Sequence, residues 1–97
     1  KEKEKYAWQW TESENMWLQR TAIIFQLKYK LKTNADLMFD IITAQANNKE
    51  FFIRKACGWA LREYSRTNPL SVSEFINSNR DILSTLTIKE GERLMKK

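Results

Sequence analysis

Residues 17–27 read WLQRTAIIFQL, and a shift of 34 residues places them on residues 51–61, which read FFIRKACGWAL. The arginine, one alanine and the final leucine coincide, and aromatic residues recur near both ends. Because the apolar residues of both stretches follow helical spacing, each is expected to form a helix. The flanking segments obey the same shift, with Met38, Ile41 and Ile42 falling on Val72, Phe75 and Ile76.

Helical periodicity extends over almost the whole chain. Two glycines and one proline in 97 residues, with no stretch that alternates like a strand, predict an all-α fold. The helical-hairpin repeat is nearest in length and make-up to HEAT-like arrays, in which antiparallel helical hairpins stack as an α-solenoid. We expect a single partial domain over residues 1–97, with hairpins at about 1–30, 34–66 and 68–97. A register slipped by one residue, which pairs Arg20 with Lys55, remains open.

Helix starts are expected where a polar side chain can accept hydrogen bonds from the first turn. Thr11 with Glu14 forms a candidate capping box for a helix to about Lys30, and residues 5–10 read as the tail of an earlier helix. The other predicted starts are Thr33 or Asn34 for a helix through Ala46, Asn48 for residues 49–66, Asn68 with Pro69 for a helix to about Asn77, and Thr87 with Glu90 for a last helix that ends in Lys96 and Lys97.

The helix expected at residues 51–66 carries a tryptophan beside a basic stripe. On a helical wheel, Lys55, Arg62 and Arg66 share one side, and Trp59 lies between them and the apolar face. An indole flanked by guanidinium groups suits a nucleic-acid surface, and it equally suits a half-buried tryptophan among ordinary surface cations. The apolar face is assigned to Phe52, Ile53, Ala56, Cys57, Ala60 and Tyr64.

Two further positions on the expected helices bear on packing. Gly58 lies in the middle of its helix, where glycine is unfavourable, so we expect a neighbouring helix to approach the backbone there. Trp17 belongs to a helix that is apolar on nearly every side, which predicts a core position.

The formal net charge of +5 is unevenly distributed. Residues 16–33 hold four basic residues and no acid, and residues 49–66 hold five basic residues against Glu50 and Glu63. Charge concentrated on two helices favours a polyanionic partner. If both are second helices of stacked hairpins, the positive groove would contain Lys28, Lys55, Arg62 and Arg66.

The composition excludes several function classes. Without histidine, the chain lacks the commonest general base and the usual metal ligand, and no metal or cofactor is expected. Cys57 is the only cysteine, so it cannot form a disulfide within the chain, and we expect a small buried side chain in a reducing, cytoplasmic protein. The longest apolar run, residues 22–25, is far too short to span a membrane, and no membrane partner is expected.

Two long segments carry a family resemblance. Residues 14–30, ENMWLQRTAIIFQLKYK, and residues 49–69, KEFFIRKACGWALREYSRTNP, resemble the HEAT-like-repeat DNA alkylation repair proteins, and the likeness extends from about Trp10 to Met95. The resemblance implies a monofunctional glycosylase that removes N3- and N7-alkylated purines from double-stranded DNA.

The resemblance also implies roles for individual residues. Arg20 matches the family's cleft arginine, which contacts the DNA backbone near the lesion, although its orientation depends on the repeat register. Trp59 matches the tryptophan that packs against the damaged nucleotide, and Arg62 is expected to contact phosphate. The predicted lesion cleft therefore consists of Arg20, Trp59, Arg62, Lys55, Lys28 and Arg66.

The catalytic group of the family has no counterpart in this chain. The family's catalytic carboxylate follows a tryptophan pair on an upstream helix, and no such Trp-Trp-Asp-like stretch occurs here. The chain also begins with lysine rather than methionine, so we expect an inactive C-terminal fragment of a glycosylase. Its truncated face, with Trp8 and Trp10, would favour self-association. The alternative is a non-enzymatic helical-repeat scaffold that binds a DNA structure or an acidic protein.

Overall fold

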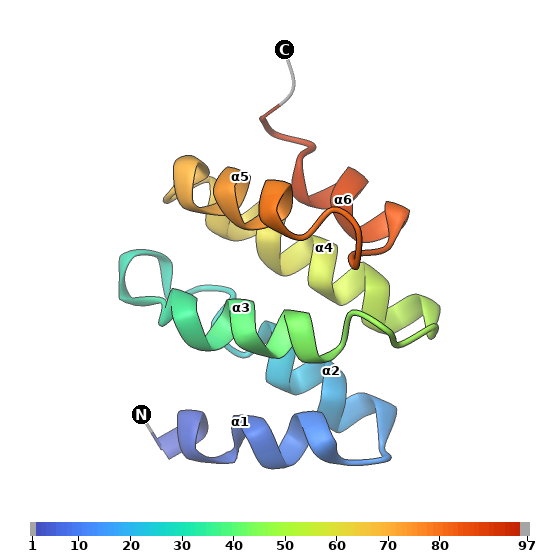
Figure 1. Cartoon of the computed structure of the whole chain (residues 1–97). Helices are drawn as coiled ribbons and strands as arrows, with labels where there is room; N and C mark the ends of the chain where they lie inside the picture. Colours follow the sequence, from blue (N-terminus) through green and yellow to red (C-terminus); the bar gives the residue numbers. More distant parts are fainter. Residues whose placement is uncertain (1, 96–97) are drawn as a thin grey trace.

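A computed structural model describes residues 2–95, which form six α-helices and one short 3-10 helix and contain no strand (Figure 1). The expected all-α fold of stacked antiparallel hairpins is confirmed. The helices are α1 (Glu2–Glu12), α2 (Met16–Ile24), α3 (Ala35–Ala44), α4 (Phe51–Ser65), α5 (Pro69–Ser78) and α6 (Thr85–Gly91), with the 3-10 helix at Lys30–Lys32.

The helices form two layers. Figure 1 shows α1, α3 and α5 stacked in one layer, with the second helix of each hairpin behind them. Helix α4 is the centre of the stack, because it packs against α2, α5 and α6, whereas α1 packs against α2 and α3. The second helices therefore form a continuous layer from α2 through α4 to α6.

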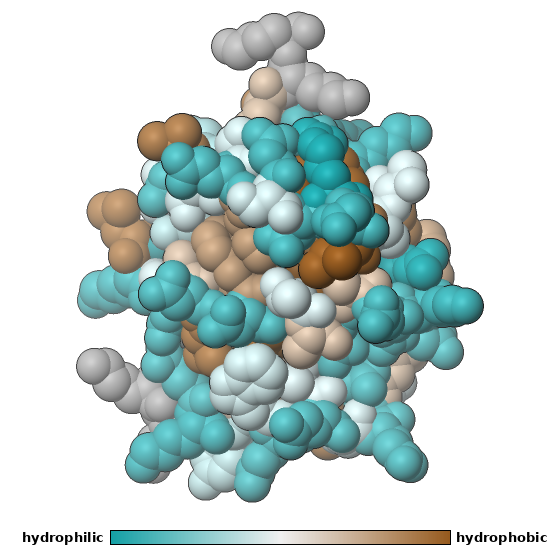
Figure 2. Space-filling model, in the orientation of Figure 1, coloured by the Kyte–Doolittle hydropathy of each residue, from teal (hydrophilic) through white to brown (hydrophobic). Residues whose placement is uncertain are grey.

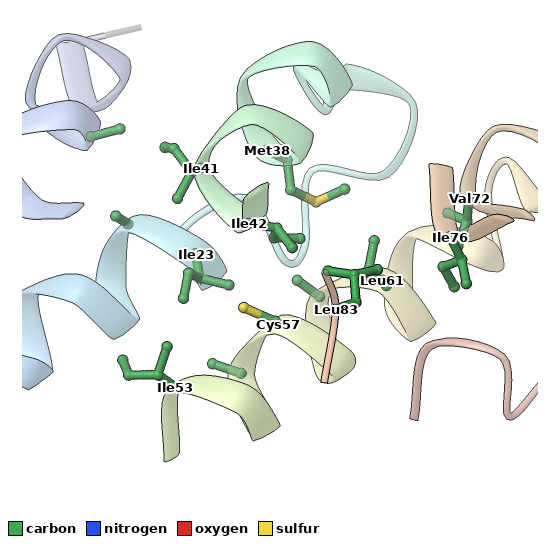
Figure 3. Close-up of a cluster of buried hydrophobic side chains, with 14 residues drawn as sticks. Ile23, Met38, Ile41, Ile42, Ile53, Cys57, Leu61, Val72, Ile76 and Leu83 are labelled. Atoms are coloured by element: carbon green, nitrogen blue, oxygen red, sulfur yellow. The ribbon is translucent and has the colours of Figure 1, made fainter. Parts of the chain in front are cut away.

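The core lies between the two layers. Figure 3 shows Ile23 of α2, Ile42 of α3 and Cys57 of α4 pointing toward one another. Burial repeats with the 34-residue shift, since Ala22 and Ala56 are both buried, as are Ile23 and Cys57. Seven large side chains are almost completely buried: Ile23, Ile41, Ile42, Ile53, Leu61, Val72 and Ile76.

Aromatic contacts add to the packing both within and between the layers. Phe39 of α3 stacks on Phe75 of α5 with ring centroids 4.4 Å apart. Figure 2 shows hydrophilic residues over most of this face and hydrophobic residues between α3 and α5. Near the N-terminus, Trp10 packs edge-on against Phe25, whereas Trp8 is exposed.

Two of the predicted helix caps are confirmed. The side chain of Asn34 accepts a hydrogen bond from the backbone N–H of Leu37, and that of Asn68 accepts one from Ser71. Pro69 occupies the first turn of α5, where its missing N–H leaves no hydrogen bond unmade.

The start predicted at Thr11 is wrong. Thr11 lies inside α1 and is buried, and Gln45 Nε2 donates to both its carbonyl and its hydroxyl oxygen at 2.8 Å. Asn15 caps α2 instead, and α2 ends at Ile24 rather than near Lys30. Lys30 adopts a left-handed backbone conformation with φ of 54°, which an uninterrupted helix would not allow.

Two other caps also differ from the prediction. Asn48 binds the backbone N–H of Glu50, the residue before α4, and so stabilises the turn rather than the helix. Ser84 caps α6, and the Thr87 hydroxyl instead donates to the Arg54 carbonyl across the α4–α6 interface. The predicted helix end at Lys96 and Lys97 lies outside the described residues.

Two aromatic residues are more exposed than predicted. Trp17 was expected in the core and is 57% exposed, and Phe52, assigned to the apolar face, is 50% exposed. Both lie in the first turns of their helices, at the edge of the stack, where their rings pack against each other with centroids 6.0 Å apart.

The close approach predicted at Gly58 is confirmed, and the neighbour is α6. A Cβ atom at Gly58 would lie 2.5 Å from Glu90 Cβ and 3.3 Å from the Thr87 carbonyl oxygen. Real Cβ contacts do not occur at the first distance, so the backbones can pack this closely only because residue 58 is glycine.

We predict that Gly58→Ala lowers the free energy of unfolding by about 1–3 kcal/mol, the usual cost of overpacking, even though alanine favours a helix. Urea unfolding followed by circular dichroism measures the loss. Gly91→Ala serves as the control, because its nearest contacts, at 3.1 and 3.2 Å, are less severe and predict a smaller loss. A Gly58→Ala protein as stable as the wild type would contradict the close helix contact.

Candidate nucleic-acid interface

Arg20 of α2 and Trp59 of α4 meet on the layer of second helices. The guanidinium carbon of Arg20 lies 5.9 Å from the centroid of the Trp59 ring, within the range of a cation–π interaction. Both residues are half-buried. The structure thus directs Arg20 toward Trp59, an orientation that depended on the repeat register in the sequence.

Lys55 and Arg62 lie on either side of Trp59 along α4, and α6 supplies their counter-charge. Lys55 Nζ lies 3.2 Å from Glu90 Oε2, and Arg62 Nη1 lies 3.3 Å from Glu90 Oε1. Arg93 Nη1 approaches the same Oε1 at 3.5 Å. One carboxylate of α6 therefore joins two cations of α4 and a third from the turn that follows α6.

The Glu90 carboxyl group is electrostatically stabilised in its ionised form. Its hydrogen bond from Lys55 holds the pKa of Glu90 below the ordinary value of 4.5, and the positive charges of Arg93 and Arg62 act in the same direction. Burial opposes this shift without overcoming it. Glu90 is consequently a fixed negative charge near neutral pH.

Among the described residues, neither Lys28 nor Arg66 pairs with Glu90. Arg66 Nε pairs with Glu63 Oε1 at 3.2 Å and lines a narrow cavity with Lys30 at the C-terminal end of α4. Lys28 lines a different hollow, together with Glu4, Tyr29 and Lys32. The six predicted cleft residues thus have three kinds of neighbour: Arg20 contacts Trp59, Lys55 and Arg62 share Glu90, and Arg66 and Lys28 contact other residues.

The sequence-based prediction missed Glu90 and Arg93 as parts of this surface. Glu90 was interpreted only as a capping partner of Thr87, because nothing in its local sequence indicates contact with a helix 28 to 35 residues earlier. Gly58 was the one available signal, since a mid-helix glycine predicts a close neighbour but does not identify it.

The described residues contain neither an ionised thiol nor a cluster of metal ligands. Cys57 is buried as expected, and burial raises the pKa of its thiol to about 12, so the thiol stays protonated. Among the residues described, no three or more histidine, cysteine, aspartate or glutamate side chains gather as metal ligands would. No helix in the described part of the chain combines the length and the apolar character needed to cross a membrane.

Comparison with known proteins identifies the family of this chain. A family model described as "DNA alkylation repair enzyme" matches residues 1–95. The chain belongs to the DNA alkylation repair enzyme family. Among solved structures, a predicted DNA alkylation repair enzyme from Enterococcus faecalis is 40% identical, with a TM-score of 0.87 over 96% of this chain. The present chain spans 43% of that protein's chain. No curated protein matches.

We predict that the ion cluster makes stability depend on pH in the acid range. Because the pKa of Glu90 is lowered on folding, the unfolded state binds more protons just below 4.5, and stability falls as the pH decreases through that range. The difference in melting temperature between wild type and Glu90→Gln should therefore be largest above pH 4.5 and shrink below it. A difference that stays constant across this range would contradict an ionised Glu90 paired with Lys55.

Proposed function

We propose that this chain is the C-terminal, DNA-binding half of a glycosylase that hydrolyses the N-glycosidic bond of N3- and N7-alkylated purines in double-stranded DNA. The observation that carries the proposal is the contact of Arg20 with Trp59, inside a chain that belongs to a DNA alkylation repair family. A reducing, cytoplasmic setting suits the buried Cys57 thiol.

The indole of Trp59 suits the charge of the substrate. Alkylation at N3 or N7 leaves a planar purine ring with a positive charge, and the negative face of an indole attracts such a cation. Arg20 already places a planar, delocalised cation near this ring. The same ring is half-exposed in a helix layer that carries further cations, so it can lie against a nucleotide while they contact the backbone.

The surrounding cations suit the DNA backbone. Lys55 and Arg62 flank Trp59 on α4, and each retains N–H donors beyond those that face Glu90. Lys28 and Arg66 provide additional positive charge farther along the chain's surface. Such phosphate contacts orient a duplex without reading its sequence, as a repair protein that searches for lesions requires.

The chemical step needs a group that we place outside this chain. In the reaction, the bond between the purine nitrogen and sugar C1′ breaks, and the bonding electron pair leaves with the base, which becomes neutral. Water then forms a bond to C1′ and gives up a proton. A carboxylate that stabilises the positively charged sugar and orients the water completes the site. The described residues contribute binding and orientation.

We predict that Trp59→Ala weakens binding of this chain to a duplex with one N7-methylguanine by about 2- to 30-fold, the range expected for a cation–π contact. Its affinity for the undamaged duplex should change less. Fluorescence anisotropy with both duplexes measures the two effects. Trp17→Ala removes an exposed indole from the neighbouring helix α2 and serves as the matched control. Equal losses for both duplexes would make Trp59 a packing residue only.

We predict that Arg62→Ala weakens binding to undamaged duplex and reduces the slope of log affinity against log salt by roughly 0.9, the value for one lost phosphate contact. Titrations at several salt concentrations measure the slope. Arg80→Ala removes an arginine that lies between α5 and α6 and pairs with Glu92 rather than Glu90, and it should change the slope less. An unchanged slope for Arg62→Ala would rule out its phosphate contact.

We predict that the 97-residue chain releases no N7-methylguanine from duplex DNA above the uncatalysed rate. Chromatography of released bases measures this, with a longer protein that contains the chain and an upstream aspartate-bearing helix as the comparison. Release by the chain alone would contradict the absence of a catalytic group. DNA binding without release by the longer protein would instead favour the non-enzymatic scaffold.

A further inference from the structure

Glu90 occupies an unusual position on a surface that otherwise suits polyanions. It is a negative residue between Lys55 and Arg62, the two cations that flank Trp59. Its side chain is 16% exposed, whereas that of Lys55 is 48% exposed. The carboxylate therefore lies beneath the cations, close to any phosphate that they would bind.

Both oxygens of this carboxylate are engaged. Oε2 accepts from Lys55, and Oε1 lies within ion-pair distance of Arg62 and Arg93. A DNA phosphate that approaches Lys55 or Arg62 must share these donors with Glu90 and is repelled by its charge. Each cation thus attracts phosphate less strongly than it would beside a neutral side chain.

Packing prevents Glu90 from moving aside. Its Cβ lies against the backbone of Gly58, and its neighbours in α6, Thr87 and Gly91, are buried against α4 and α5. The negative charge is therefore a fixed part of the surface.

Arg20 differs from the other cations in this respect. In the part of the chain that the structure describes, no carboxylate lies within ion-pair distance of Arg20, whose recorded contact is the Trp59 ring. Arg20, which is assigned to the backbone beside the lesion, thus has no carboxylate counter-charge within the described residues, whereas Lys55 and Arg62, which are assigned to other backbone contacts, are partly neutralised.

We propose that Glu90 is a built-in counter-ion that limits the attraction of Lys55 and Arg62 for DNA phosphates, and so restrains binding to undamaged DNA. This inference rests on the proposed DNA-binding function. Glu90 acts through Lys55 and Arg62, and its effect is greatest for contacts that any duplex offers. The Arg20 and Trp59 contact then provides a larger share of the total affinity at a damaged nucleotide.

The test compares Glu90→Gln with Glu92→Gln. Both variants remove one negative charge from the C-terminal part of the chain, but Glu92 pairs with Arg80 rather than with the cations that flank Trp59. Binding is measured for an undamaged duplex and for inorganic tripolyphosphate over a range of salt concentrations. Glu90→Gln should bind both anions about two- to fivefold more tightly, the effect of one exposed ion pair, with a steeper salt dependence. Glu92→Gln should show a smaller gain.

The two probes separate this inference from the proposed function. Suppose that neither the wild type nor either variant binds the duplex, but Glu90→Gln alone binds tripolyphosphate more tightly. The proposed DNA-binding function is then wrong, whereas the role of Glu90 as a counter-ion is supported. Equal gains in affinity for Glu90→Gln and Glu92→Gln would show that the effect comes from net charge alone, and would overturn the inference. Weaker binding by Glu90→Gln would also overturn it, because Glu90 would then support the cations rather than compete for them.

A second variant keeps the test valid if Glu90→Gln does not fold. Glu90→Asp retains the charge and the Cβ contact with Gly58 but withdraws the carboxylate by one methylene from Lys55 and Arg62. It should show a smaller gain for both anions in the same direction. A loss of affinity in this variant would overturn the inference.

Discussion

The absence of a side chain at Gly58 allows α6 to lie directly on the backbone of α4, and the rest of the surface depends on that contact. It brings the Thr87 hydroxyl to the Arg54 carbonyl and the Glu90 carboxylate to Lys55. Any larger residue at position 58 would separate the helices. One backbone position therefore links the packing of the last hairpin to the charge of the helix layer that we propose binds DNA.

Two kinds of electrostatic contact meet on this layer. The Trp59 ring attracts Arg20 through its negative face, and a formal carboxylate holds Lys55 and Arg62. The first contact leaves the positive charge available to an anion, whereas the second partly neutralises it. The net charge of the chain does not distinguish Arg20 from Lys55 and Arg62. Their different partners explain why we assign the contact with the damaged nucleotide to Arg20 and Trp59. Backbone contacts whose strength Glu90 limits are assigned to Lys55 and Arg62.

Local sequence predicted the elements better than their ends. Asn34 and Asn68 cap their helices as expected, because each side chain has its own backbone N–H partner only three residues away. Thr11 and Thr87 are equally suitable caps by sequence, yet both bind partners on other helices. Trp17 is apolar but lies in the first turn of α2, at the edge of the stack, where its ring is exposed. In these cases tertiary contacts override the local preference.

The sequence by itself determined the helical class, the repeat, the concentration of positive charge on two segments and the place of Trp59 beside a basic stripe. These properties follow from the periodicity and composition of the sequence, which depend only on residues close to one another in the chain. Only the tertiary structure decided that Arg20 lies on Trp59 and that Glu90 joins Lys55 and Arg62. The physical reason is that ionic and cation–π contacts act over a few ångströms, and helix packing alone sets which distant residues come that close.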